Sequence, residues 1–476
     1  MGRFWTWMWE GPDDHRVATA LFLKGLALIY GVAFVSLMGQ IEGLSGSQGI
    51  LPLAEAQANQ ARHLGWERFL AFPSLFWLNA SDAALVGAAG VGAAAAALAL
   101  LGVFPRAMFL ACYVLYLSLY HAGSIFLNFQ WDTLLLEAGF LAIFLAGGGA
   151  RLVVGMMRLL LFKLRFLSGV SKLTSGDPAW SSLSAVMAYF EVQPLPHVGA
   201  WYAHQLPEVV LRSGAALVLF VELVVPFFFL MPRSWRMAGA WMTIALQLMI
   251  LATSNHNWIN ILTILLCLFL FDDKALAGWA PRRWRDGAAG SMATGMRLLF
   301  APLAAVILTT SAAQVYWMVI DKHATGWSRT LETVAGGFAV ANRYHVFPTM
   351  KPERLELVIE TSPDGRTWRP LKFRYKPGDP SEPPRFVLPH QPRLDWLLWF
   401  VPVGNPEFML VYERFLGRLA EGSPPVLALL PPDAAAGGPP RFARTHLALY
   451  RFTDFETRAR TGRWWTVTPR VPFPPF

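Results

Sequence analysis

Long apolar runs separated by short polar breaks constrain the fold of this chain more than any other feature. Hydrophobic residues make up 55% of the sequence and charged residues 15%, so lipid is the expected solvent for most of the chain. An α-helix needs about 20 apolar residues to cross hydrocarbon, and the sequence predicts a polytopic α-helical membrane protein. The candidate spans are 17–38, 83–104, 107–127, 131–149, 209–231, 237–252, 258–271 and 298–320.

The distribution of basic residues indicates a ninth crossing. With eight spans, the basic cluster that follows the seventh span would lie outside, against the tendency of such clusters to remain in the cytoplasm. If 152–169 also crosses, the basic loops face the cytoplasm and the C-terminal domain lies outside, in a periplasm or lumen. This location depends on the short run 258–271. If that run does not cross, all residues after it lie on the opposite side of the membrane. The cluster consists of Lys274, Arg282, Arg283 and Arg285.

The net charge of +9 does not indicate a nucleic-acid partner, because the basic residues lie mostly at the ends of apolar runs. Three of them, Arg158, Arg165 and Lys172, follow one another at seven-residue spacing and share one face of the predicted helix. Buried cations need acidic partners from neighbouring spans. The candidates for this charge network are Asp132, Glu137 and Glu222. Alternatively, Asp132 caps a helix and the cations extend to the membrane surface.

Two outside loops, 39–82 and 171–208, are candidates for contact with other molecules. The first is too long for a simple connector, and we expect a surface cap or a partner-binding element. The second is rich in polar and aromatic groups that could form a site at the membrane surface, although its tryptophan and tyrosine could equally be interfacial anchors. No zinc-ligand spacing such as HExxH is present, and no metal or cofactor is predicted. The residues are Trp180, Tyr189, Glu191, His197, Trp201, Tyr202 and His204.

After residue 320 the apolar pattern changes from helical to strand periodicity. Residues 355–379 alternate on both sides of a Pro-Asp-Gly turn, which predicts a β-hairpin. Helices are expected at 394–401 and 406–420, and strands at 442–452 and 464–468. The sequence therefore predicts a transmembrane domain, 1–320, followed by a β-rich α+β water-facing domain, 321–476. The only two cysteines, Cys112 and Cys267, lie in apolar runs and predict no disulfide.

Several ordered segments resemble the lipase maturation factor family. They are NFQWDTLLLEAGFLAIFLA, SGDPAW, QPLPHVGAWYAHQLP, NRYHVFPTMKPERLELVIE, FRYKPGD, PHQPRLDWLLWF and EGSPPVLALL. The resemblance implies a polytopic membrane protein that, in animals, resides in the endoplasmic reticulum and assists folding and assembly of secreted dimeric lipases. The expected partners are the bilayer and an exported client protein. The richness in Ala, Gly, Arg and Pro looks bacterial, which implies the inner membrane.

A shorter segment, RFLSGVSKLTSGDPAW, is similar to part of the vitamin K-dependent γ-glutamyl carboxylases and related bacterial HTTM proteins. That resemblance implies a membrane enzyme with Lys172 as the catalytic base. A third possibility is a transporter that uses the buried charges, although no internal repeat is evident. A maturation factor should tolerate the loss of any one ionisable group, whereas an enzyme should lose activity when Lys172 or Glu137 is neutralised.

Overall fold

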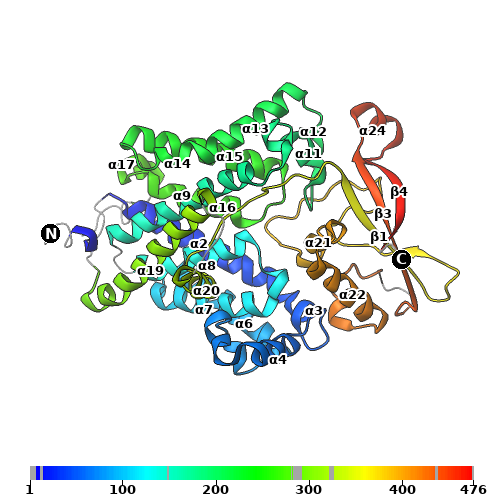
Figure 1. Ribbon diagram of the computed structural model, residues 1–476, viewed down its shortest axis with the longest axis horizontal. Helices are drawn as coiled ribbons and strands as arrows, with labels where there is room; N and C mark the ends of the chain where they lie inside the picture. The colour runs from blue at the N-terminus through cyan, green and yellow to red at the C-terminus, as the bar shows by residue number, and fades with distance from the viewer. Residues whose placement is uncertain are drawn as a thin grey trace.

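The computed structural model describes residues 7–10, 14–146, 150–279, 281, 292–320, 326–434 and 438–473. A bundle of helices occupies one end of the molecule, and an antiparallel sheet with flanking helices occupies the other (Figure 1). The expected combination of a helical multi-span membrane domain and a C-terminal mixed α/β domain is confirmed. Of the basic cluster used to count crossings, Arg282, Arg283 and Arg285 lie outside the described residues.

Six helices in the described part of the chain are long and apolar enough to cross a membrane. They are α2 (Arg16–Met38), α6 (Asp82–Leu101), α7 with its following 3-10 turn (Pro105–Phe126), α13 with α14 (Glu208–Phe228), α15 (Arg233–Thr253) and α19 (Thr294–Val319). Local sequence sets their ends. Gly102, at φ +84°, ends α6 in the left-handed conformation, and Pro105 begins α7, where a missing N–H costs nothing.

The other three expected spans are helices that do not meet the same criteria. Helix α8 (Gln130–Leu145) has 16 residues and α16 (Trp258–Cys267) has 10, which gives lengths of about 24 and 15 Å. Helix α9 (Arg151–Thr174) has 24 residues but carries five basic side chains. All three pack against one another inside the bundle (Figure 1). By length and composition the structure thus has about six candidate spans, fewer than the eight or nine predicted.

Both outside loops fold into short helices. The loop 39–82 contains α3 (Ile41–Ser45), α4 (Leu53–Leu64) and α5 (Arg68–Ala71). The loop 171–208 contains α10 (Pro178–Ser181), α11 (Ala185–Val192) and α12 (Val198–His204). Helix α20 (Trp327–Gly337) follows the last long helix and contacts α5.

The C-terminal sheet has four antiparallel strands in the order β2-β1-β3-β4. They are β1 (Arg354–Ser362), β2 (Arg369–Pro370), β3 (Phe442–Phe452) and β4 (Trp465–Phe473). The expected strand 442–452 coincides with β3, and the expected helices correspond to α21 (Arg393–Leu398) and α22 (Pro406–Ala420). The short helices α23 (Pro424–Leu427) and α24 (Phe455–Thr461) complete the domain.

The predicted hairpin is only partly correct. Its first arm is β1, but its second arm contributes the two residues of β2 before the chain leaves the sheet. The reason is a competing set of hydrogen bonds: the backbone N–H groups of Tyr375 and Lys376 donate to the Asp395 carboxylate at 2.8 and 3.0 Å. The Arg374 side chain also bonds to the carbonyls of Leu430 and Ala428. The long partner of β1 is instead β3.

Helices cover both faces of the sheet. On one face, Val358, Ala448 and Tyr450 pack with residues of α11 and α12. On the other face, Leu357 and Ile359 belong to the same core as residues of α22. Successive side chains of a strand point to opposite faces of the sheet, so β1 and β3 can each pack against helices on both faces. The loop 171–208 is therefore a structural layer of the C-terminal sheet.

Candidate functional site

Three buried carboxylates of the helical bundle form the candidate site. Asp132 and Glu137 lie on α8, and Glu222 lies on α13. A buried carboxylate needs hydrogen bonds and a cation to offset the loss of water. At each of the three, a residue from beyond position 340 contributes to the network that satisfies this need. The three centres therefore join the bundle to the C-terminal domain.

At the first centre, Asp132 pairs with Arg393 of α21. The guanidinium donates from Nη1 to Oδ2 at 2.6 Å and from Nη2 to Oδ1 at 2.7 Å, which is a bidentate ion pair. The Tyr116 hydroxyl also donates to Asp132 Oδ1 at 2.6 Å. Asp132 does not face the basic row of α9, and it lies in the first turn of α8, where its carboxylate also bonds to the backbone of Phe129, the N-cap residue. The cation comes from a segment 261 residues further along the chain.

At the second centre, Glu137 accepts four hydrogen bonds. Lys163 Nζ donates at 3.0 Å, Asn342 donates from its backbone N at 3.0 Å and from Nδ2 at 2.9 Å, and the Tyr344 hydroxyl donates at 2.8 Å. Lys163 also donates to Ser311 Oγ of α19. The sequence analysis did not single out these donors. Lys163 lies outside the seven-residue row on α9, although a lysine in the middle of an apolar helix was a usable signal.

At the third centre, Glu222 is shared by Arg165 and Lys172, both on α9. Lys172 Nζ lies 2.7 Å from Glu222 Oε2, and Arg165 Nη2 donates to Oε1. Lys172 also donates to the backbone oxygen of Val346 at 2.6 Å, beyond the last long helix. The expected row is only partly brought together, because Arg158 donates to Phe269 O and contacts His15 instead.

A cavity of about 90 Å³ adjoins the third centre. Lys172, Glu222, Tyr189 and His256 line it together with side chains from α15 and α16. Two amide groups in its wall, Gln247 Nε2 on α15 and Asn260 Nδ2 on α16, have no hydrogen-bond partner within the described part of the chain. The cavity has room for water molecules that would satisfy them. Its lining is mostly apolar, and its size suits water or a very small ligand.

The acceptors around Lys172 define its role. Its Nζ faces the Glu222 carboxylate, the Val346 oxygen and, at 3.5 Å, the Ser168 oxygen. The Trp180 ring centroid lies 5.1 Å away. An ammonium donates three hydrogen bonds and accepts none, so this cage of acceptors suits the charged form. The arrangement favours a structural cation over a neutral general base.

The loop residues expected to form an open site are mostly covered by the sheet. Glu191 accepts the backbone N–H of Phe452 at 2.7 Å, and Trp201 packs edge-on against Trp464 and Phe455. Trp180 and His197 are also buried, and Tyr189 lies beside the cavity. Tyr202, which is 50% exposed, and the partly exposed Tyr189 and His204 reach the surface. The expected exposure was wrong because the residues pack against strands far along the chain.

His256, in the turn between α15 and α16, predicts a pH effect on stability. Burial lowers the pKa of its imidazole to about 3, and the Tyr189 hydroxyl contacts its Nε2. The unfolded chain binds this proton near pH 6.5, while the folded chain does not. Stability should therefore be complete above pH 6.5 and decline as the pH falls from there toward 3. Chemical unfolding at several pH values should show a shallower decline in His256→Asn; an identical decline would contradict this assignment.

The loop 39–82 carries five exposed large apolar side chains. We define the 66–78 patch as Trp66, Phe69, Leu70, Leu75 and Leu78. Leu78 is 88% exposed and Trp66 is 68% exposed. Contiguous exposed apolar side chains of this kind mark a protein or membrane contact site. The patch lies on the same side of the bundle as the C-terminal domain, because Arg418 and Ser423 donate to the oxygens of Gly49 and Gln48.

Comparison with known proteins accounts for both parts of the chain. The lipase maturation factor transmembrane domain matches residues 17–278, and the lipase maturation factor C-terminal domain matches residues 340–473. Lipase maturation factor 2 of Gallus gallus is 31% identical, over 96% of this chain and 80% of the relative.

Two further relatives are also lipase maturation factors. Lipase maturation factor 2 of Xenopus laevis is 30% identical, over 95% of this chain and 81% of the relative. Lipase maturation factor 1 of Bos taurus is 28% identical, over 96% of this chain and 88% of the relative. No solved structure matches. The family domains cover both the bundle that holds the three carboxylates and the sheet domain that reaches them, and the chain belongs to the lipase maturation factor family.

Proposed function

We propose that this chain holds partly folded exported proteins beside the membrane and assists their maturation. The observation that carries the proposal is the 66–78 patch, a mixed aromatic and aliphatic surface in a loop that is bonded to the C-terminal domain. Broad apolar surface binds many unfolded segments without requiring a particular sequence. The names of the relatives indicate a lipase as the client class.

The position of the domain supports an odd number of crossings. The C-terminal end of α2 is bonded to residues 390–393 through Ser36 and Gln40. The N-terminal end of α2 therefore lies across the bundle from the C-terminal domain. Adding α8, α9 and α16 to the six long helices gives nine crossings, which agrees with this arrangement. We propose a domain boundary near residue 320 and a domain that faces the periplasm of a bacterial cell, or the lumen of the endoplasmic reticulum in a eukaryotic one.

Site-specific photocrosslinking in intact cells tests the proposal. A photoreactive amino acid at Leu78 should capture an exported protein, and the same residue at Asn59, an exposed polar position of α4, should not. Trp66→Ser combined with Leu78→Ser should then lower the active, secreted yield of the captured protein. Capture of lipid alone at Leu78 would show that the patch is a membrane anchor and would contradict the proposal.

The cavity beside Lys172 favours a second candidate, a membrane enzyme with Lys172 as base. If Lys172 is a structural cation, Lys172→Met should lower the folded yield, while the activity per folded molecule is retained. Lys172→Arg should restore part of the yield, because it keeps a cation beside Glu222. Normal folding of Lys172→Met with complete loss of activity would instead support the enzyme. Both quantities can be measured on the same preparation by quantifying folded protein and client maturation.

A further inference from the structure

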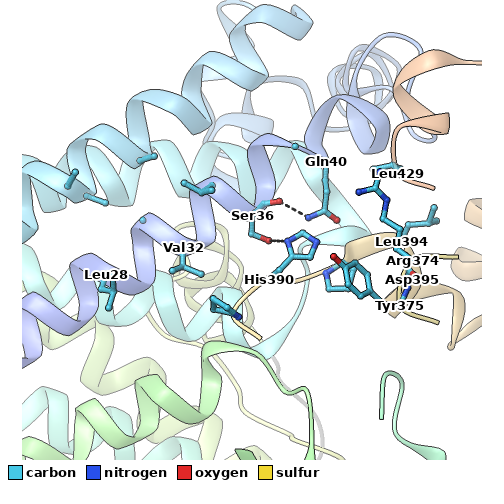
Figure 2. Close-up of a pocket in the computed structure, with 18 of the residues that line it drawn as sticks. Leu28, Val32, Ser36, Gln40, Arg374, Tyr375, His390, Leu394, Asp395 and Leu429 are labelled. Carbon is cyan, nitrogen blue, oxygen red and sulfur yellow. Dashed lines mark hydrogen bonds between the residues drawn. The ribbon is translucent and has the colours of Figure 1, made fainter. Parts of the chain in front are cut away.

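A groove of about 680 Å³ runs from the membrane helices to the C-terminal domain (Figure 2). Helices α2 and α6 line one part, and residues near 374–375 and 389–395 line the other. Its volume falls in the range of pockets that hold one small molecule. None of the three carboxylate centres contributes to it. It is therefore a separate feature of the bundle.

The membrane end of the groove is apolar and open to the side. Leu28 and Val35 of α2 line it and are 58% and 57% exposed. Gly31 of α2 and Ala93 of α6 leave space between them because their side chains are small. The groove follows α2 from Ala27 to Gln40, a rise of about 20 Å. Since α2 and α6 are long enough to span a bilayer, the surrounding medium here is acyl chains.

The other end of the groove is polar and carries a cation. Figure 2 shows Ser36 and His390 at the junction, with Tyr375 and Arg374 beyond them. The Arg374 guanidinium is held in place, since Nε donates to Leu430 O at 3.0 Å and Nη2 donates to Ala428 O at 2.8 Å. Among the described residues, no hydrogen bond engages its Nη1. Arginine in this state is suited to a phosphate oxygen.

The one carboxylate in the lining does not oppose an anion strongly. Asp395 accepts the backbone N–H groups of Tyr375 and Lys376 through Oδ1. These two donors and the neighbouring Lys376 offset its charge. Arg374 is the cation at the polar end of the groove.

We propose that the groove binds one membrane phospholipid, with an acyl chain between α2 and α6 and the phosphate at Arg374. The lateral opening, the length and the single cation match an amphiphile drawn from the surrounding bilayer. The binding is independent of the proposed function and would make the attachment of the C-terminal domain sensitive to lipid.

The test uses the full chain in phosphatidylcholine vesicles that contain a phosphatidylglycerol probe with a photoreactive group on its acyl chain. Peptides of α2 and α6 that line the groove should be labelled above the other lipid-facing helices. Ala93→Leu fills the groove, and labelling there should fall about tenfold. Ala94→Leu is the matched control, because the next residue of α6 is exposed but does not line the groove.

A second variant separates the head group from the chain. Arg374→Gln should lower labelling by the anionic probe about tenfold, as the loss of one charge-assisted hydrogen bond predicts. Soluble glycerophosphate should not compete, whereas unlabelled phosphatidylglycerol should. Equal labelling in Ala93→Leu and Ala94→Leu, or even labelling of all lipid-facing helices, would overturn the proposal. Competition by glycerophosphate would assign the site to a free anion, and would overturn it too.

Discussion

Replacing Arg393 by leucine should lower the free energy of unfolding by about 3–5 kcal/mol, the usual effect of removing one partner from a buried ion pair. The loss leaves Asp132 with only the Tyr116 hydroxyl and its own helix, in a site where both charged side chains are at most 1% exposed. Bulk solvent does not reach this site to replace the two bonds from the guanidinium. The same substitution removes the contact between α21 and the end of α7 through Phe126 O.

Unfolding in mixed detergent micelles measures this effect. The matched control is Arg385→Leu, in the same domain, because Arg385 forms a half-exposed pair with Glu382 that should contribute only about 0–1 kcal/mol. The double variant Asp132→Leu with Arg393→Leu should recover much of the loss, since it leaves no unpaired charge. If Arg393→Leu were as stable as Arg385→Leu, the pair would not join the two parts of the molecule.

The local patterns in the sequence predicted elements well but not their long-range partners. The alternation in 442–452 was enough to place β3, and the apolar periodicity placed α21 and α22. The second arm of the hairpin failed because its N–H groups bond to Asp395, a side chain from the next segment. When a carboxylate takes the place of a strand partner, the apolar periodicity of the two segments does not reveal it.

The candidate site shows the same limit. Spacing on one helix correctly singled out Arg165 and Lys172 as neighbours, since both reach Glu222. It could not find Arg393 for Asp132, because that pair joins positions 261 residues apart. Similarly, Trp201 and Glu191 read as surface groups because their covering strands lie more than 200 residues later. Charged residues within apolar helices could be predicted to be buried from the sequence. Their partners could be identified only from the structure.

Glu222→Gln should lower the free energy of unfolding by at least about 3–5 kcal/mol, because one carboxylate serves two buried cations. Glutamine keeps the shape and one acceptor but removes the charge between Arg165 and Lys172. The two cations would then repel each other across a centre that also includes the Val346 carbonyl. The loss should therefore loosen the segment that leads from α19 into the C-terminal domain.

The same helix supplies the control. Glu208→Gln, at the exposed start of α13, affects only the surface pair with Arg212 and should change stability by less than about 1 kcal/mol. Adding Lys172→Met to Glu222→Gln should recover part of the loss by removing one of the two cations, whereas Lys172→Met alone should be destabilising. Such a pattern in unfolding measurements would arise only if Glu222 and Lys172 act as a pair. If the two effects were simply additive, Lys172 would be held by its backbone acceptors, and the link from Glu222 to the C-terminal domain would be absent.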